Sequence, residues 1–349
     1  MLKMARTIGV LAVFACIMAL FMSSPAMART VVNPNNMQVP PPGNGGALKI
    51  AELVNEERAK YGLKPLKFYS FAPVQKAARI RAGEIRQKFE HLRLNNSQWY
   101  TVLDSLNINY SFAGENIGKA SGMKPENVMQ MWMASQEHRD NILNPEYNMI
   151  GVGCAWSPFL NVFCWTQIFL KTDDADKSFI DLLPLYADDI KSMNLNPGID
   201  IDSRIAKNMT YVTEAASKIA AGDKSAKQYL ILGHASKFLG DYLGARDSFF
   251  NALKAEPGNV RIYSAIASTF DYPYDIQKRL AWLQKGESLG VRDSELYAYL
   301  AQTYSKLNQD EKALYYANLA VEVDPNSNFA ISVRKNILDF QEYKKRNSH

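Results

Sequence analysis

The sequence predicts two domains of different structural class, an α+β domain in the first half of the chain and an all-α domain in the second. Residues 47–135 space their apolar side chains as amphipathic helices do, and two β-rich runs follow at 150–156 and 162–169. From residue 176 onward no run is typical of a strand, and small and large apolar residues recur at a fixed period. A chain of 349 residues also exceeds the roughly 150 residues of an average domain, which supports the division.

The composition is that of an ordinary soluble globular protein. Hydrophobic residues make up 47% of the chain and charged residues 21%, without a glycine period or a polar low-complexity tract. These values exclude a fibrous, collagen-like or wholly disordered protein. The formal charge of +5, from 40 basic and 35 acidic residues, is too small to indicate a nucleic-acid partner.

Residues 1–28 have the organisation of a secretory signal peptide. Lys3 and Arg6 precede an apolar run at 8–22, and Ala26-Met27-Ala28 forms a small-residue cleavage site. We expect cleavage after Ala28 and a mature protein without a transmembrane segment, secreted or periplasmic. An uncleaved membrane anchor is the alternative, although the run is shorter than the roughly 20 residues that a span needs.

The mature chain is predicted to begin with a flexible segment at 29–46, which is rich in Asn, Pro and Gly. Helices are predicted at 47–61, which ends at the glycine C-cap Gly62, at 71–89, and from Pro125 to about Ser135. The predicted division is a signal peptide at 1–28, a flexible lead-in at 29–46, an α+β domain at 47–171, a linker at 172–202 and a helical domain at 203–349.

Two cysteines, Cys154 and Cys164, remain after removal of the signal peptide, in a compartment that permits disulfides. They lie in two β-rich runs that a Pro-bearing turn at 157–161 joins, so a hairpin is predicted. If Trp156 pairs with Val162, the two cysteines lie opposite each other, at a separation that suits a disulfide. The sequence favours this disulfide over two buried free thiols.

The second half contains a repeat of 34 residues. In the unit 226–259 the diagnostic residues are Tyr229, Leu232, Gly233, Ala245, Phe249, Ala252 and Pro257. The unit 294–327 keeps the same register, and the unit 260–293 between them is degenerate, because Arg279 replaces a small residue. The pattern resembles the tetratricopeptide repeat, which implies a solenoid with a protein partner, and residues 328–345 are predicted as its end-cap helix. Helical hairpins of another lineage are the alternative.

Five motifs in the first domain occur in an order that resembles a bacterial CAP domain, the family of cysteine-rich secretory proteins, antigen 5 and pathogenesis-related proteins, also called SCP. They are Phe89-Glu-His91-Leu-Arg93, Ala113-Gly-Glu-Asn-Ile117, Trp132-Met-Ala-Ser-Gln-Glu-His138, Ile150-Gly-Val-Gly153 and Trp165-Thr-Gln167. The resemblance implies an α-β-α sandwich with a central cleft in an extracellular protein.

The resemblance also implies which residues line the cleft. His91 matches the family's first histidine and Glu115 its first acid, whereas Ser135 stands at the position of the second acid. His138 takes the place of the second histidine, as in bacterial members. On a continuous helix Ser135 and His138 share a face, and Glu137 is turned away from it.

His91, Glu115 and His138 would suit a divalent metal such as zinc, because imidazole and carboxylate ligands with one open position can activate water. The alternative is that the same groups hydrogen-bond across the cleft and fix its loops. The first domain has no G-x-S-x-G, glycine-rich phosphate or H-E-x-x-H motif, so the sequence leaves open whether the protein is an enzyme.

We therefore expect a secreted or envelope protein of bacterial type that binds and scaffolds. Its cleft would hold a lipid, a peptide or an envelope component, and its repeats would hold a protein. The alternative is a metal-dependent hydrolase of an extracellular peptide or wall polymer, with the repeats as a targeting module.

Overall fold

A computed structural model describes residues 45–122, 124–157, 160–177, 179–182, 201–270 and 274–346. The predicted signal peptide lies outside these residues, so its cleavage stays a prediction. Helix α1 (Gly45–Lys60) begins just inside the segment that was predicted as a flexible lead-in. No helix in the described part of the chain is both long and apolar enough to span a membrane.

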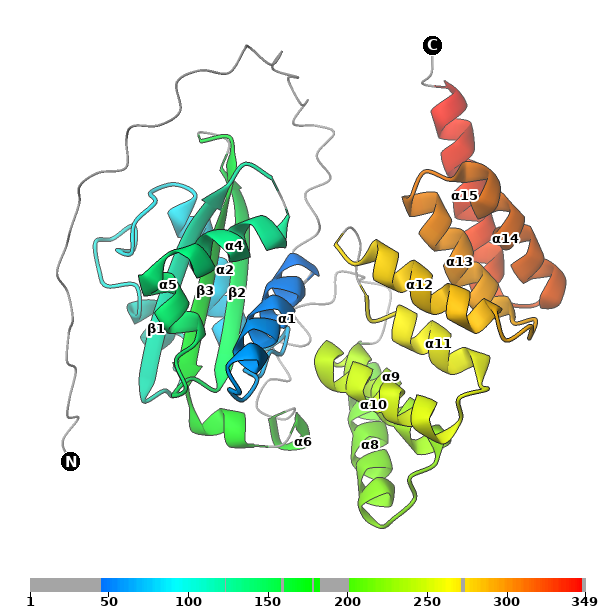
Figure 1. The fold of residues 1–349 in the computed structure, drawn as a ribbon, viewed down its shortest axis with the longest axis horizontal. Helices are drawn as coiled ribbons and strands as arrows, with labels where there is room; N and C mark the ends of the chain where they lie inside the picture. Colours follow the sequence, from blue (N-terminus) through cyan, green and yellow to red (C-terminus); the bar gives the residue numbers. More distant parts are fainter. Residues whose placement is uncertain are drawn as a thin grey trace. The chain divides into compact units, whose positions relative to one another are not determined.

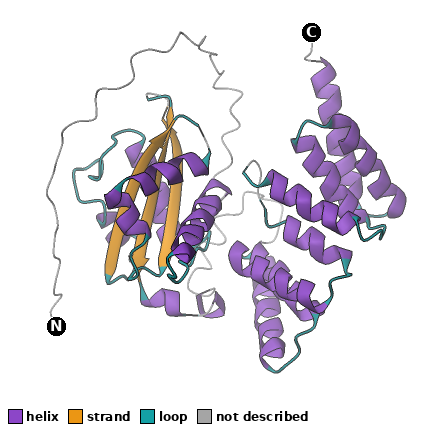
Figure 2. Cartoon of the chain, viewed as in Figure 1, coloured by secondary structure: helices purple, strands orange, loops and turns teal. Residues whose placement is uncertain are grey.

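A three-stranded antiparallel sheet forms the centre of the first domain (Figure 2). Its strands lie in the order β1 (Phe112–Ala120), β3 (Val162–Lys171) and β2 (Met149–Ser157). The middle strand β3 is buried along almost its entire length, as expected of a strand covered on both faces. Because β1 is an edge strand, Arg81 of α2 and His91 of the following loop can both reach Glu115 of this strand.

Helices cover both faces of this sheet (Figure 1). Helix α2 (Pro73–Ile85) packs on β2 and β3, whereas α1, α4 (Pro125–Ala134) and α5 (Gln136–Ile142) cover the opposite face. The fully buried Trp132 of α4 donates its indole N–H to the carbonyl oxygen of Ile117, at 3.1 Å. The arrangement confirms the predicted α-β-α sandwich.

Two glycines of β2 allow α2 to approach the sheet at backbone distance. A Cβ atom on Gly153 would overlap the carbonyl group of Ala78 and lie 3.0 Å from the Cβ of Ala82. A Cβ on Gly151 would similarly meet the backbone of Val74 and Gln75. Gln75 completes this contact, because its side-chain amide exchanges hydrogen bonds of 2.6 and 2.8 Å with the backbone of Val152. The helix is therefore fixed on the strand by backbone contact.

The predicted disulfide between Cys154 and Cys164 is not formed in the structure, where both thiols are free. Cys154 pairs with Trp165, and Cys164 pairs with Ala155, one residue away from the predicted register. Paired residues point to the same face of a sheet and successive residues to opposite faces. The one-residue shift therefore places the two thiols on opposite faces, where they cannot bond.

Eight helices follow from residue 201 in the described part of the chain. They are α8 (Ile201–Ala220), α9 (Ala226–Phe238), α10 (Tyr242–Ala255), α11 (Val260–Ala267), α12 (Ile276–Glu287), α13 (Ser294–Lys306), α14 (Asp310–Val323) and α15 (Asn328–Arg346). Within each predicted 34-residue unit two helices pack against each other, and α15 packs against the last pair. This confirms the all-α fold class of the second half.

Small and large side chains alternate in this packing as the repeat pattern requires. The ring of Phe249 fills the space beside Gly233, where an added Cβ would come within 2.6 Å of the ring atom Cδ1. In the degenerate middle unit the buried Arg279 reaches the following unit instead. Its guanidinium donates to Thr303 Oγ1 at 3.1 Å and to Gln302 Oε1 at 3.2 Å.

The start of the predicted linker at 172–202 is packed rather than free. It contains the 3-10 helix η2 (Asp173–Asp176) and the short helix α6 (Phe179–Leu182). Ala175 and Leu182 are buried in a hydrophobic cluster with residues of α2. The rest of the predicted linker, 183–200, lies outside the described residues.

Candidate functional site

The centre of the candidate cleft is the carboxylate of Glu115, near the start of the edge strand β1. Its side chain is buried and accepts a hydrogen bond from Arg81 Nε of α2, at 2.8 Å to Oε1. The other oxygen, Oε2, lies 2.8 Å from Nδ1 of His91. The side chain of His91 is 55% exposed, so this imidazole is the part of the pair that solvent can reach.

Arg81 is the residue that joins the cleft to the rest of the domain. Its fully buried guanidinium also pairs with Glu84, 2.5 Å away, and donates to the carbonyl oxygens of Glu90 and His91. Glu84 in turn accepts two hydrogen bonds from Arg93. Burial alone would raise the pKa of Glu84, but these two arginines outweigh it and lower that pKa. The network therefore fixes the loop that carries His91.

Ser135 and His138 do not share a helical face, because they do not lie on one continuous helix. The helix breaks at Ser135, whose extended backbone (φ −90°, ψ 129°) ends α4 and begins α5. His138 stands on α5, where burial and then the nearby His91 lower the pKa of its imidazole. Its buried Nδ1 has no hydrogen-bond partner among the described residues.

Side-chain amides hold α5 against the sheet. Asn116 donates to the carbonyl oxygen of His138 and to Gln167 Oε1, at 3.0 Å in each case. Asn141 of α5 donates back to Asn116 Oδ1 at 2.9 Å. These contacts give Asn116, Asn141 and Gln167 a structural role.

Arg58 supports the same region from α1 and was not singled out in the sequence. It is fully buried and donates to the carbonyl oxygens of Ile142 and Asn144, at 2.9 and 2.8 Å. Burial lowers the pKa of this guanidinium. Arg58 and Arg81 are the two anchors that sequence reasoning missed; a sequence signal was present only for Arg81, which lies one helical turn before Glu84.

The described cleft fits a hydrogen-bonded network better than a metal site. Both oxygens of Glu115 already have hydrogen-bond partners. The guanidinium of Arg81 supplies the positive charge beside this carboxylate that a metal ion would otherwise supply. Among the residues that the structure describes, no group of three or more His, Cys, Asp or Glu side chains is placed to hold a metal ion. Zinc binding by His91, Glu115 and His138 stays a prediction.

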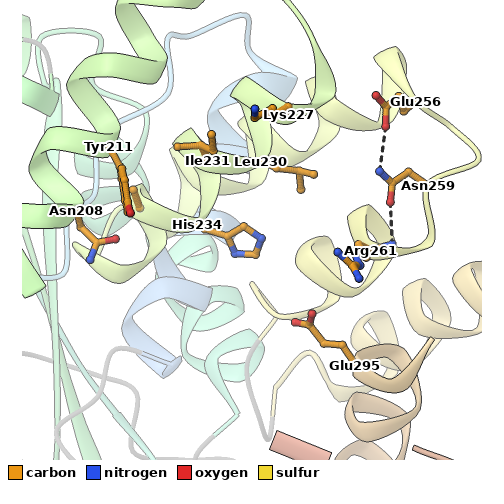
Figure 3. A pocket seen from close by; sticks show the side chains of 11 residues that line it. Asn208, Tyr211, Lys227, Leu230, Ile231, His234, Glu256, Asn259, Arg261 and Glu295 are labelled. Atoms are coloured by element: carbon orange, nitrogen blue, oxygen red, sulfur yellow. Dashed lines mark hydrogen bonds between the residues drawn. The ribbon is translucent and has the colours of Figure 1, made fainter. Parts of the chain in front are cut away.

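A cavity lies in the helical region, on the faces of α8, α9, α11 and α13, and we call it the groove (Figure 3). Its volume is about 710 Å³. Asn259 spans one side, donating to Glu256 at 2.9 Å and accepting from the backbone N–H of Arg261. Its lining combines apolar and oppositely charged side chains: Asn208, Tyr211, Lys227, Leu230, Ile231, His234, Ala235, Glu256, Asn259, Arg261 and Glu295.

Comparison with known proteins finds similarity to the first domain. Residues 51–169 match the model of the cysteine-rich secretory protein family, CAP. A curated relative, the uncharacterized protein YkwD of Bacillus subtilis (strain 168), is 41% identical over 125 residues, which are 35% of this chain and 46% of YkwD. The chain thus covers less than half of the length of that relative.

Two solved structures resemble different halves of the chain. An extracellular protein containing an SCP domain from Bacillus anthracis str. Ames is 24% identical, with a TM-score of 0.33, over 37% of this chain and 41% of that one. The first TPR domain of human RPAP3 is 18% identical, with a TM-score of 0.32, over 35% of this chain and 96% of that one.

Proposed function

We propose that this chain, in which a CAP domain is followed by tetratricopeptide-like helices, is a binding and scaffolding protein that works outside the cytoplasm. The groove takes an extended segment of a partner protein, and the CAP cleft takes a peptide or another polar component of the cell envelope. The observation that carries the proposal is the groove, because its volume is in the range of ligand sites and its polar groups are spaced along several helices.

The lining of the groove favours a peptide over a lipid as its occupant. Lys227 and Arg261 offer cationic donors, whereas Glu256 and Glu295 offer acceptors for a basic side chain or a backbone N–H. Leu230 and Ile231 supply apolar surface between them. A peptide carries all three kinds of complementary group, whereas a lipid tail would leave the charged groups without partners.

The cleft supports the same class of function. Both carboxylate oxygens of Glu115 already have partners in Arg81 and His91, so the cleft offers no free carboxylate to a charged ligand. The exposed imidazole of His91 and the loops around it are suited to hydrogen-bond a polar ligand. A lipid ligand, which the sequence left open, has no comparable support from this polar lining.

Peptide binding in the groove is expected to depend on its cationic side chains. A library of extended peptides is screened on the full chain, and the affinity of the selected peptide is then measured for Lys227→Glu and Arg261→Glu. Each reversal should weaken binding by about ten-fold or more, through lost attraction and new repulsion. Lys254→Glu is the matched control, because this exposed lysine of α10 lies outside the groove. Equal affinity in all variants, or failure to select any peptide, would contradict the proposal.

The effect of zinc on the melting temperature distinguishes this proposal from metal-dependent hydrolysis. Because Arg81 already compensates Glu115, a small molar excess of zinc should leave the melting temperature of the wild type unchanged. A zinc-dependent rise that both His91→Ala and His138→Ala abolish would instead establish the metal site and favour the hydrolase. Glu137→Ala serves as the control, since Glu137 is not among the cleft residues.

A further inference from the structure

Helix α1 of the CAP domain carries two charged side chains that are buried although neither belongs to the cleft. Lys49 and Glu52 are three residues apart and therefore lie on one face of α1. Charged side chains are rarely this buried unless they have partners of opposite charge. The nearest partner of each comes from the helical region, about 200 residues further along the chain, and Lys49 has a more distant second partner in Glu126 of α4, at 3.9 Å.

The two ion pairs have opposite polarity. Lys49 Nζ lies 2.9 Å from Asp275 Oδ1, and each of these side chains is only 6% exposed. Glu52 Oε1 lies 2.6 Å from Arg246 Nη1. The CAP domain thus contributes one cation and one anion, and the helical region contributes the complementary pair.

The partners in the helical region are themselves held in place. The guanidinium of Arg246 donates two hydrogen bonds to Thr269, one to its side-chain Oγ1 at 2.9 Å and one to its carbonyl oxygen at 3.0 Å. Its guanidinium also lies 4.2 Å from the centre of the Phe270 ring. An arginine fixed by three contacts loses little further freedom when it pairs with Glu52.

Backbone and apolar contacts accompany the ion pairs. Ser70 of the CAP domain donates from its N–H and its hydroxyl to the carbonyl oxygen of Gly240, at 3.3 and 3.0 Å. Gly240 has φ +90°, and a Cβ there would overlap the Ser70 hydroxyl. Phe71 of the CAP domain and Leu239 of α9's C-terminal end belong to one buried hydrophobic cluster.

We propose that the CAP domain and the helical region form a single cooperative unit, closed by the crossed ion pairs Lys49–Asp275 and Glu52–Arg246. Buried ion pairs add little net stability compared with apolar residues, but a mispaired register would bury charges without partners. The crossed polarity therefore selects one docking arrangement. The cleft and the groove are then carried on one folding unit, so stabilisation of either site by a ligand is transmitted to the other.

A double-mutant cycle on the full chain tests the proposal. The variants are Lys49→Met, Asp275→Leu and the double variant, compared by calorimetry. The wild type should unfold in one transition. Lys49→Met leaves the buried Asp275 with only the half-exposed Lys278, 3.6 Å away, and Asp275→Leu leaves the buried Lys49 with only Glu126, 3.9 Å away. Each single variant should therefore lower the melting temperature by about 10 °C, whereas the apolar double variant should recover most of the loss. Asp275 makes no side-chain capping bond to α12, and its ion pair with the half-exposed Lys278 of that helix is lost in both Asp275→Leu and the double variant, so it does not contribute to the recovery.

Lys60→Met is the matched control on the same helix, because Lys60 is 63% exposed and pairs only at the surface of α1. It should shift the transition by less than about 2 °C. Hydrogen exchange adds a readout that reports the interface itself: Lys49→Met should raise exchange in α12 as well as in α1. Additive single effects, two separate transitions in the wild type, or unchanged exchange in α12 would each overturn the proposal.

Discussion

Replacing Gly153 with alanine is expected to destabilise the CAP domain by about 3 kcal/mol or more, which is at or above the upper end for an overpacked core. The added methyl group would overlap the carbonyl group of Ala78, so α2 would have to move away from β2 as a rigid element. Flexible side chains can relieve such overlap at small cost, but a helix backbone cannot. Urea unfolding monitored by circular dichroism measures the change in the free energy of unfolding.

A second glycine of α2 provides a control substitution that should change the free energy of unfolding in the opposite direction. Nothing lies within 4 Å of a Cβ added to Gly83, in the last turn of α2. Gly83→Ala should therefore stabilise the domain by about 0.5–1 kcal/mol, because alanine favours the helix and restricts the unfolded chain. If both alanine variants changed stability alike, backbone contact between α2 and β2 would not be what Gly153 provides.

Replacing Arg81 with methionine is expected to cost about 3–5 kcal/mol, the usual effect of removing one partner from a buried ion pair. The buried carboxylate of Glu115 would lose its ion pair with the guanidinium of Arg81. The carbonyl oxygens of Glu90 and His91 would each lose a hydrogen-bond donor. Thermal and urea unfolding of the full chain give the loss directly. Arg86→Met, at an exposed arginine just beyond the end of α2, should change stability by less than about 0.5 kcal/mol.

A double variant distinguishes two causes of the loss: the unpaired charge left on Glu115 and the missing side chain of Arg81. In Arg81→Met combined with Glu115→Leu no buried charge is left unpaired, so a substantial part of the stability should return. The cleft should nevertheless stay altered, because the His91 loop has lost its anchor. No recovery in the double variant would show that Arg81 contributes mainly through its other contacts, with Glu84 and the carbonyl oxygens of Glu90 and His91.

The helical region was predictable because its determinants are close in sequence. Gly233 and Phe249 belong to one 34-residue unit, and their small-against-large packing is visible in the spacing alone. The position of Arg81 was not predictable in this way, because Glu115 lies 34 residues away on a strand that meets α2 only in the folded domain. His91 and Glu115 were found together through a family resemblance, not through spacing.

The register of the hairpin shows where the sequence pattern carries no information. Strand β3 is buried on both faces, so its residues do not alternate between apolar and polar, and nothing in the pattern separates one register from the next. The prediction for Cys154 and Cys164 was wrong by one residue for this reason. The end of α4 near Ser135 was predicted, but the apolar spacing of that helix ends at Trp132 and did not indicate that α5 begins directly after Ser135.

Arg279 restricts which repeat can follow the unit 260–293 in this protein. A standard repeat meets its neighbours through small and apolar residues, so copies can in principle be deleted, duplicated or grafted. Here Arg279 needs the hydroxyl of Thr303 and the amide of Gln302, both on the first helix of the next unit. A consensus repeat inserted after residue 293 would place apolar side chains against a buried guanidinium. The length of this array is therefore fixed by a polar junction, and engineered extension has to begin after the last unit or carry the matching threonine and glutamine with it.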